Sequence, residues 1–533
     1  MANLAHQFVG ELMAPRAWIL LLVPFLLLLA HYSLAAFSAK RQGKQKQQGG
    51  HDPPPSPPAL PILVHLHLVG SLPHISLGRL AQKHGYGLML LRLGAMPVLV
   101  VSSPRAAEAV LRTHDHVFAS RPHSVVAEVV LYGPSDVGLA PYGDYWRQTR
   151  KLVTTHLLSA KKVRSFRLAR EEEVSLVLAR IGEAAAVGAV VDVSELIWSF
   201  MNDLACRAVM GKSFRGEGWN KQFQDLVAIT SPLVAGFNAE EFFPFLARFG
   251  VISKMVRTKS ERLRRRWDEL LDRLIQDREV KYEHGASARV PKDGDDFIHE
   301  LLSVREEYGL TREQMKAILL DVFFAGIDTS ASVLDFTMAE LLRKPHVMKK
   351  LQAEVRSSVP EGREFVGEAN LTDTAYLKAV IKESLRLHPV APILLPHFSM
   401  ESCCVDGYEI PAGVRVLVNA WAMGRDRRFW EDPLEFIPER FLDGGSAKDV
   451  DFKGNDFQFL PFGSGRRMCG GVNFAMTSVE LMLANLVHCF DWEMPEGSDI
   501  DMSEEFGLIV HRKEKLLSIP KLRAASTFDG SYI

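Results

Sequence analysis

One loop near the C-terminus limits what this 533-residue chain can fold into more than any other stretch. Residues 462–471 read FGSGRRMCGG, with a single cysteine, Cys469, and with Arg467 two positions before it. Gly463 and Gly465 can adopt left-handed backbone conformations, which bring the main chain close to a flat group. Backbone N–H groups beside the sulfur stabilise the thiolate, which is the form that binds a metal. The loop therefore predicts a thiolate bound to the iron of a haem, with the Arg467 fork on a propionate; an ordinary buried cysteine is the alternative.

The pattern F-x-x-G-x-R-x-C-x-G in this loop resembles the cytochrome P450 family, and the resemblance runs from about residue 50 to the C-terminus. It implies haem b as cofactor, contacted by Phe462, Arg467 and Gly471. It also implies that Cys469 is the axial iron ligand, which pushes electron density onto iron and favours O–O cleavage. The implied fold is mainly α, a large helical domain with a small β-rich region after an N-terminal transmembrane helix. Gly470 departs from the proline that plant members usually carry after the cysteine.

Composition and charge exclude several classes of protein. With 47% hydrophobic residues the chain can build a large core, and its 63 basic and 64 acidic residues leave a net charge of −1. Nothing in this balance argues for a nucleic-acid partner. The five cysteines are sparse and irregularly spaced, so we expect free thiols in a reducing compartment and no disulfide framework.

The N-terminus carries a candidate membrane anchor. Residues 17–37 are nearly all apolar, about the length that spans a bilayer. The basic run at 40–46 outweighs the single Arg16 before it, so the positive-inside rule leaves the catalytic domain in the cytosol. A cleaved signal peptide is the alternative. We expect a single-pass anchor in the lipid of the endoplasmic reticulum membrane, and divide the chain into an anchor over 1–39, a polar and proline-rich linker over 40–61, a haem-thiolate monooxygenase domain over 62–525 and a tail over 526–533.

Hydrophobic periodicity predicts a mostly helical domain with a small sheet near its start. Apolar positions three or four residues apart predict helical stretches over 145–183, 255–283, 311–343 and 346–356. Short apolar runs at 88–93 and 98–101 predict strands. Polar stretches rich in Gly and Asp at 284–296 and 443–456 predict surface loops.

The predicted helix over 311–343 carries Ala325-Gly326-Ile327-Asp328-Thr329 in its middle. A glycine, an acid and an alcohol are costly inside an apolar helix. The hydroxyl of Thr329 can bond back to a carbonyl one turn earlier and widen the helix. An acid beside an alcohol suits proton transfer. The alternative is that these residues form a helix cap or a polar helix face. The segment matches the A/G-G-x-D/E-T-T/S pattern of the family, which implies O2 activation by Thr329 and proton delivery by Asp328.

Charged residues elsewhere resemble the framework that holds haem in the family. Glu383 and Arg386 lie at i and i+3 of a helix and can pair. With Arg440 they resemble the Glu-Arg-Arg structural network. The W-x-x-x-R pattern of Trp146 and Arg150 implies contact with a propionate.

The resemblance also implies a propionate contact for His397. Around these positions, exposed cations would form a basic face that steers the acidic NADPH-cytochrome P450 reductase: Arg147, Lys151, Lys161, Lys162 and Arg466.

The resemblance further locates an apolar substrate pocket, suited to a compact ring system. Its expected residues are Phe323, Phe324, Ala325, Ile393, Leu394 and Leu508. The segments expected to contact substrate are 131–139, 232–243, 323–324, 390–395 and 506–509. Residues 101–113 and 142–145 resemble the grass secondary-metabolism branch that oxidises indole-derived benzoxazinoid precursors.

The implied function is a membrane-anchored monooxygenase. The expected reaction is hydroxylation of a small lipophilic metabolite, with indole-derived compounds as candidates, using O2 and electrons from the reductase. A haem-thiolate isomerase or dehydratase, and a non-catalytic haem-binding membrane protein, remain the alternatives.

Overall fold

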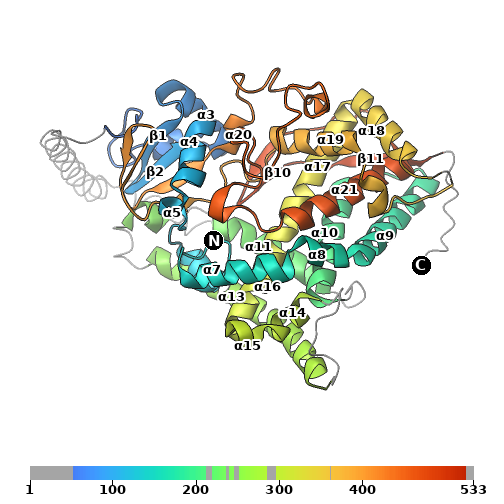
Figure 1. Cartoon of the computed structure of the whole chain (residues 1–533), viewed down its shortest axis with the longest axis horizontal. Helices are drawn as coiled ribbons and strands as arrows, with labels where there is room; N and C mark the ends of the chain where they lie inside the picture. Colours follow the sequence, from blue (N-terminus) through green and yellow to red (C-terminus); the bar gives the residue numbers. More distant parts are fainter. Residues whose placement is uncertain are drawn as a thin grey trace, which may run out of the picture.

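The computed structural model describes residues 52–211, 219–235, 239–244, 251–284, 296–360 and 362–523. The predicted anchor, the tail and nearly all of the loop predicted at 284–296 lie outside these residues. Figure 1 shows two unequal parts, a strand-rich region around β1 and β2 and a larger helical region around α17 and α21.

The strand-rich region is built on the two predicted strands. β1 (Leu88–Leu93) and β2 (Met96–Val101) pair antiparallel, because the apolar runs are separated by a tight turn at Gly94, whose φ is 60°. β2 also pairs with β7 (Arg415–Val418), in parallel, and β7 pairs antiparallel with β4 (His397–Phe398). The sheet order β1-β2-β7-β4 thus brings residues from both ends of the chain together.

Smaller sheets complete the β structure of the described residues. They are formed by β5 (Cys403–Val405) with β6 (Tyr408–Ile410), β9 (Glu504–Phe506) with β10 (Val510–Arg512), and β11 (Leu517–Leu522) between β3 (Val191–Asp192) and β8 (Phe490–Glu493).

The helical region holds the main core. Its long helices are α9 (Arg167–Ala186), α10 (Val193–Met210), α11 (Trp219–Ala235), α13 (Val251–His284), α16 (Arg312–Gly326), α17 (Asp328–Arg343), α18 (Pro345–Ser357), α19 (Ala375–Leu387) and α21 (Val472–Cys489). α16 begins with a capping box between Thr311 and Gln314, as the sequence suggested by placing a hydroxyl before the apolar repeat. α17 and α21 are buried along most of their length. Since α21 begins at Val472, the cysteine loop directly precedes a core helix.

Shorter helices connect these elements. They are α3 (Pro73–His84), α4 (Pro104–Glu108), α5 (Asp115–Phe118), α6 (Val125–Val130), α7 (Asp144–Leu152), α8 (Ala160–Ser165), α12 (Ala239–Phe242), α14 (Phe297–Ser303), α15 (Arg305–Tyr308) and α20 (Ala420–Met423).

Two predicted helical stretches are interrupted. The stretch over 145–183 is divided into α7, a π-helical turn over Val153–Leu157, α8 and α9. Ser159 caps α8 by accepting a hydrogen bond from the Lys162 N–H, and this local bond starts a new helix inside a continuous apolar repeat. The stretch over 311–343 is interrupted at Ile327.

All five cysteines are free, as predicted. Among the described residues, Arg312–Arg343 is long and apolar enough to cross a membrane, but 72% of its apolar window is buried inside the protein. It is therefore the core helix of the domain.

Candidate functional site

The cysteine loop takes the shape that its glycines permit. Gly463 and Gly465 have φ values of 69° and 67°, in the left-handed region that favours glycine. A Cβ on Gly465 would lie 1.9 Å from the carbonyl oxygen of Leu111, so only glycine fits there. The N–H of Cys469 donates to the carbonyl of Phe462 at 2.9 Å and closes the loop.

The sulfur of Cys469 has the surroundings of a thiolate ligand. The Gly471 N–H donates to Sγ at 3.3 Å. Burial among protein atoms raises the pKa of the thiol, whereas the Gly471 hydrogen bond and the charge of Arg150 lower it. The Cys469 side chain is nevertheless exposed, so it lines an accessible space inside the fold. Arg150 is held by donating to the carbonyl of Met468.

Arg467, within this loop, packs against Trp146 of α7. The guanidinium of Arg467 lies 4.1 Å from the centre of the Trp146 ring. Its Nε donates to the Ala119 carbonyl at 2.5 Å and its Nη2 to the Ala140 carbonyl at 2.6 Å. Burial, followed by repulsion from Arg121, lowers the pKa of Arg467 to about 9.

Arg121 and His397 lie near Arg467 and interact with it electrostatically. Nη1 of Arg121 donates to the carbonyls of Leu395 and Pro396 at 2.8 and 2.9 Å, and burial lowers its pKa to about 10. Burial, assisted by the charge of Arg121, lowers the pKa of His397 to about 3. Since Nδ1 of His397 lies 2.9 Å from the Phe118 carbonyl, that nitrogen carries the proton of the neutral ring.

We call Arg121, Arg150, Arg467 and His397 the cationic cluster. Within the described residues, none of its three guanidinium groups forms an ion pair with a carboxylate, and their hydrogen bonds go to backbone carbonyls. Sequence reasoning missed Arg121, because a lone arginine in the loop Ser120-Arg121-Pro122 carries no signal of its own.

A second feature missed from the sequence is a pair of buried acids, Asp136 and Asp321. Asp321 on α16 accepts a hydrogen bond from the Val137 N–H at 2.6 Å, and Asp136 accepts from the Leu139 N–H at 3.0 Å. Burial raises the pKa of Asp321 to about 7, and burial with the charge of Asp321 raises the pKa of Asp136. The pair joins α16 to the loop whose Val137 carbonyl accepts from Trp146 at 3.0 Å.

The oxygen-side residues lie where α16 gives way to α17. The hydroxyl of Thr329 donates to the Ala325 carbonyl at 2.6 Å, as expected from the sequence. Ala325 is exposed although α16 is a core helix. Asp328 is 8% exposed, and its Oδ1 accepts from Nε1 of Trp198 at 2.9 Å.

Glu383, Arg386 and Arg440 form the predicted buried network. Arg386 donates to both carboxylate oxygens of Glu383, at 2.7 and 2.8 Å, and Nε of Arg440 donates to Glu383 at 3.1 Å. The Ile437 N–H adds a fourth bond to the same carboxylate at 2.8 Å. Remaining guanidinium donors reach carbonyls, including that of Gly424 at 2.6 Å.

The residues expected in the substrate pocket differ in how deeply they are buried. Phe323 is completely buried and stacks on Phe223 with ring centres 4.2 Å apart, so it lies in the packed core. Leu394 has a φ of 49°, unusual for a branched residue, and its Cδ1 lies 3.8 Å from the position of a Cβ on Gly463. It therefore lies beside the cysteine loop. Phe324, Ile393 and Leu508 are half-buried and Ala325 is exposed.

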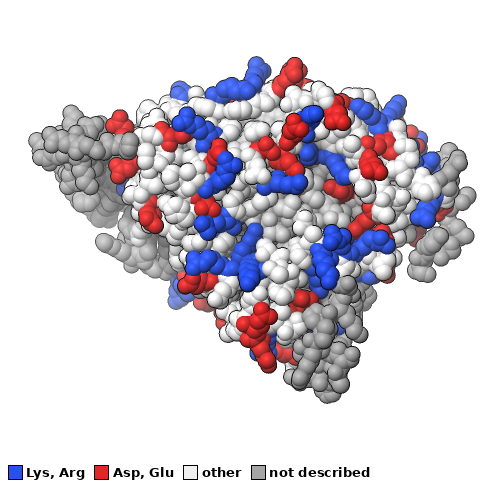
Figure 2. Space-filling view, in the orientation of Figure 1, with Lys and Arg blue, Asp and Glu red and all other residues white. Residues whose placement is uncertain are grey.

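Cations gather on the face that carries the cysteine loop (Figure 2). The guanidinium groups of Arg147 and Arg466 lie 5.4 and 5.8 Å from the centre of the Tyr142 ring. Positive charges from α7 and from the cysteine loop therefore lie on the same part of the surface. Both arginines are exposed, as are Lys151 and Lys161. Lys162 is less available, because it pairs with Glu300 at 2.8 Å, and Arg466 pairs with Asp115 at 3.1 Å.

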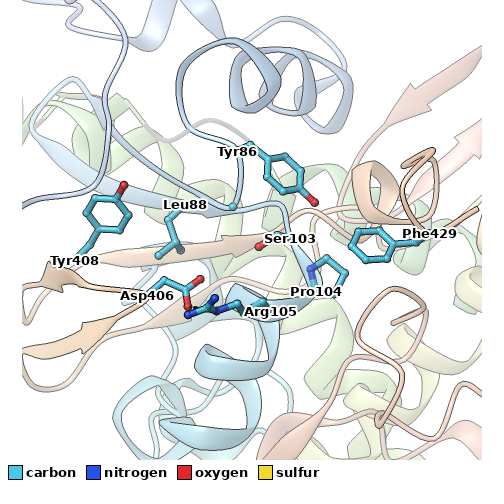
Figure 3. A pocket seen from close by; sticks show the side chains of 9 residues that line it. Tyr86, Leu88, Ser103, Pro104, Arg105, Asp406, Tyr408 and Phe429 are labelled. Atoms are coloured by element: carbon cyan, nitrogen blue, oxygen red, sulfur yellow. Dashed lines mark hydrogen bonds and ion pairs between the residues drawn. The ribbon is translucent and has the colours of Figure 1, made fainter.

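A separate pocket of about 270 Å³ lies on the strand-rich region (Figure 3). Tyr86, Tyr408 and Phe429 line it, with an ion pair between Arg105 and Asp406 at 2.9 Å. None of the predicted site residues lines this pocket, so it is distinct from the site at Cys469.

Comparison with known proteins agrees with this geometry. The family model for cytochrome P450 matches residues 54–519. An indole-2-monooxygenase of Zea mays is 52% identical over 97% of this chain and 98% of its own length. An indolin-2-one monooxygenase and a 3-hydroxyindolin-2-one monooxygenase of the same plant are 52% and 48% identical, covering 91% and 93% of this chain and 93% and 94% of theirs.

Solved structures show the same fold. Zebra fish cytochrome P450 structures with abiraterone and with progesterone have TM-scores of 0.69 and 0.71 at 24% identity. They cover 85% and 84% of this chain, and 100% and 99% of their own chains are matched.

Proposed function

Because this chain belongs to the cytochrome P450 family, whose members are monooxygenases that bind haem through a cysteine, we propose that Cys469 is its iron ligand. We further propose that the substrate is a small lipophilic molecule with an indole-derived ring system. The observation that carries the proposal is the cationic cluster beside the exposed sulfur of Cys469.

The cluster fits haem b because of its charge. The buried guanidinium of Arg121 and the half-buried ones of Arg150 and Arg467 donate only to carbonyls, and their charges have no carboxylate ion-pair partner among the described residues. Haem b carries two propionates, and carboxylates are the acceptors that a guanidinium fork matches best. Arg121, Arg150 and Arg467 would hold the propionates, with Trp146 supporting Arg467 and His397 close by.

Bound haem supplies O2 activation and the transfer of one oxygen atom, while the other atom leaves as water. The protein has two tasks in this reaction. The Gly471 N–H and the charge of Arg150 favour the thiolate of Cys469. Asp328 would take protons from water and release them on the oxygen side of the site, returning to the carboxylate each time. The hydroxyl of Thr329 donates its own proton to the Ala325 carbonyl, so its oxygen remains a hydrogen-bond acceptor there.

The substrate proposal rests on the relatives. The three Zea mays enzymes are named for indole, indolin-2-one and 3-hydroxyindolin-2-one, which share one flat bicyclic skeleton. Leu394 offers apolar surface beside the cysteine loop, and Ala325 offers a small exposed side chain on α16, both suited to such a ring.

Spectral titration tests the substrate. The purified holoenzyme is titrated with the three indole compounds and with a terpenoid of similar size, and oxygen-dependent product is measured for each. We expect a spin-state shift and product with at least one indole compound. Binding and turnover of the terpenoid alone would contradict the substrate class, and turnover without oxygen would contradict the monooxygenase reaction.

We propose that the basic face receives the acidic NADPH-cytochrome P450 reductase, and that residues 17–37 anchor the chain in the endoplasmic reticulum membrane. Arg147 and Lys151 are exposed on α7, next to the cysteine loop, where an electron donor must approach. Charge reversal of both should lower reductase-driven turnover, more at low salt, and leave peroxide-driven turnover intact. Lys254→Glu, an exposed site on α13, serves as the control. Equal losses in both assays would contradict the docking role.

A further inference from the structure

The acid proposed to deliver protons is held by a residue far away in the sequence. Nε1 of Trp198 on α10 donates to Oδ1 of Asp328 at 2.9 Å. We propose that Trp198 is a positioning residue for proton delivery: its indole N–H fixes one carboxylate oxygen of Asp328 and leaves the other to exchange protons with water. This inference rests on the proposed role of Asp328.

Asp328 is the first residue of α17. The helix is interrupted at Ile327, directly before it, where ψ is −68°. The Ala325 carbonyl at this interruption accepts the hydroxyl of Thr329. Trp198 supplies, from a second helix, the side-chain hydrogen bond that holds the Asp328 carboxylate.

α10 is a suitable rigid support for that contact. Ser194, one turn before Trp198, donates to Asp335 on α17 at 2.6 Å. Asp335 is itself held by Nε of Arg512 at 2.7 Å. The Ser194 bond fixes α10 against α17 one turn before Trp198, and Arg512 holds the acceptor of that bond in place, so the indole is kept close to Asp328.

The chemistry of the indole suits a positioning role. An indole N–H donates and cannot accept, so Trp198 orients the carboxylate without entering the proton relay. It is also neutral. Asp328 forms no ion pair among the described residues, in contrast to Glu383, whose carboxylate is shared by two arginines. A carboxylate enclosed by cations has its oxygens occupied, whereas Asp328 keeps one available.

The test is Trp198→Phe, which keeps the ring and removes the N–H. We expect normal haem content, about ten-fold less product per NADPH consumed, the order expected for one hydrogen bond to a charged group, and a larger solvent isotope effect. Trp492→Phe is the matched control, since Trp492 is also half-buried and donates one bond, to the Leu486 carbonyl at 3.0 Å. It should leave coupling unchanged.

Combination with Asp328→Asn separates positioning from general damage. Asparagine keeps an acceptor oxygen and lacks the acid, so Trp198→Phe should cost nothing further in that background. An equal loss in both backgrounds, or unchanged coupling in Trp198→Phe, overturns the inference. If Asp328→Asn itself leaves coupling intact, the proposed proton role fails as well, which distinguishes the two failures.

A spectroscopic readout needs no turnover. In full-length protein labelled with 5-fluorotryptophan, the Trp198 fluorine resonance is assigned by its loss in Trp198→Phe. It should shift in Asp328→Ala and stay in place in Asp144→Ala, an exposed acid on α7. An unshifted resonance in Asp328→Ala overturns the inference, even if Trp198→Phe fails to bind haem.

Discussion

The two arginine clusters of this protein differ in whether the chain itself supplies a carboxylate to pair with them. In the network of Glu383, Arg386 and Arg440, one carboxylate serves both guanidinium groups, and all three side chains are almost fully buried. In the cationic cluster, Arg121 and Arg467 donate to backbone carbonyls only. Burial without a paired carboxylate lowers the pKa values of these two arginines to about 10 and about 9.

This difference in pairing indicates that the Glu383 network serves folding and that the cationic cluster serves ligand binding. The first network is complete within the chain, so its removal should harm the protein before any ligand binds. The cationic cluster raises the energy of the folded chain, because burying unpaired charge is unfavourable, and an anionic ligand reverses that cost. Loss of a cation there should therefore harm haem binding more than folding.

The largest expected effect comes from Glu383→Ala. It leaves Arg386 and Arg440 buried without their carboxylate, which costs about 3–5 kcal/mol, a large part of the stability of a typical domain. We expect little folded protein and no haem absorbance. Glu493→Ala, which removes the partner of Lys521 in an exposed pair, is the control and should behave as the wild type. Normal haem content in Glu383→Ala would break the comparison.

Arg467→Gln should have a smaller and more selective effect. We expect a helical circular dichroism spectrum like that of the wild type, with haem transfer to apomyoglobin about ten-fold faster, because one charged hydrogen-bond partner of a propionate is lost. The neighbouring Arg466→Gln, on an exposed side chain, controls for position in the loop. If Arg467→Gln unfolds the protein as Glu383→Ala does, the two clusters serve the same purpose and our distinction is wrong.

The acid pair beside the cationic cluster predicts a pH dependence. The pKa of Asp321 is about 7 in the folded protein, against an ordinary value near 3.8. Between these values the folded state binds more protons than the unfolded state, so stability falls as pH rises from about 4 to about 7. Asp321→Asn should flatten that slope in thermal unfolding, while Asp144→Asn, at an exposed acid, should retain it. An unchanged slope in Asp321→Asn would contradict the raised pKa.

The smallest effect is expected at Gly470, where plant members of the family usually have proline. A Cβ there would lie 2.9 Å from Nη1 of Arg150, the flexible end of a side chain that can move by a few tenths of an ångström. Gly470→Ala should therefore cost less than about 1 kcal/mol and speed haem loss slightly. Gly143→Ala, with no atom within 4 Å of its Cβ, is the control. A large haem loss would show that Arg150 has no room to move.

Local patterns were enough to predict much of this protein. The cysteine loop, the Glu383 network and the Thr329 bond to Ala325 depend on residues close in sequence or on a distinctive motif. The membrane anchor lies outside the described residues and stays a prediction.

The missed features depend on distant contacts. Trp198 and Asp328 are 130 residues apart, and Val137 and Asp321 are 184 apart. The interruption of the predicted helical stretch at Ser159 was missed because the apolar repeat runs unbroken through it, and only the capping bond of Ser159 marks a new helix. Phe323 was expected in the pocket from the family resemblance, whereas its stacking on Phe223 is visible only in the folded chain.

The most direct test of the account is the reduced carbon monoxide spectrum of the intact protein and of Cys469→Ser. We expect the red-shifted Soret band of thiolate-ligated haem in the wild type and its loss in the variant, in which a hydroxyl replaces the sulfur. The same band in both proteins, or purified wild-type protein that takes up no haem, would contradict the claim that Cys469 binds the iron.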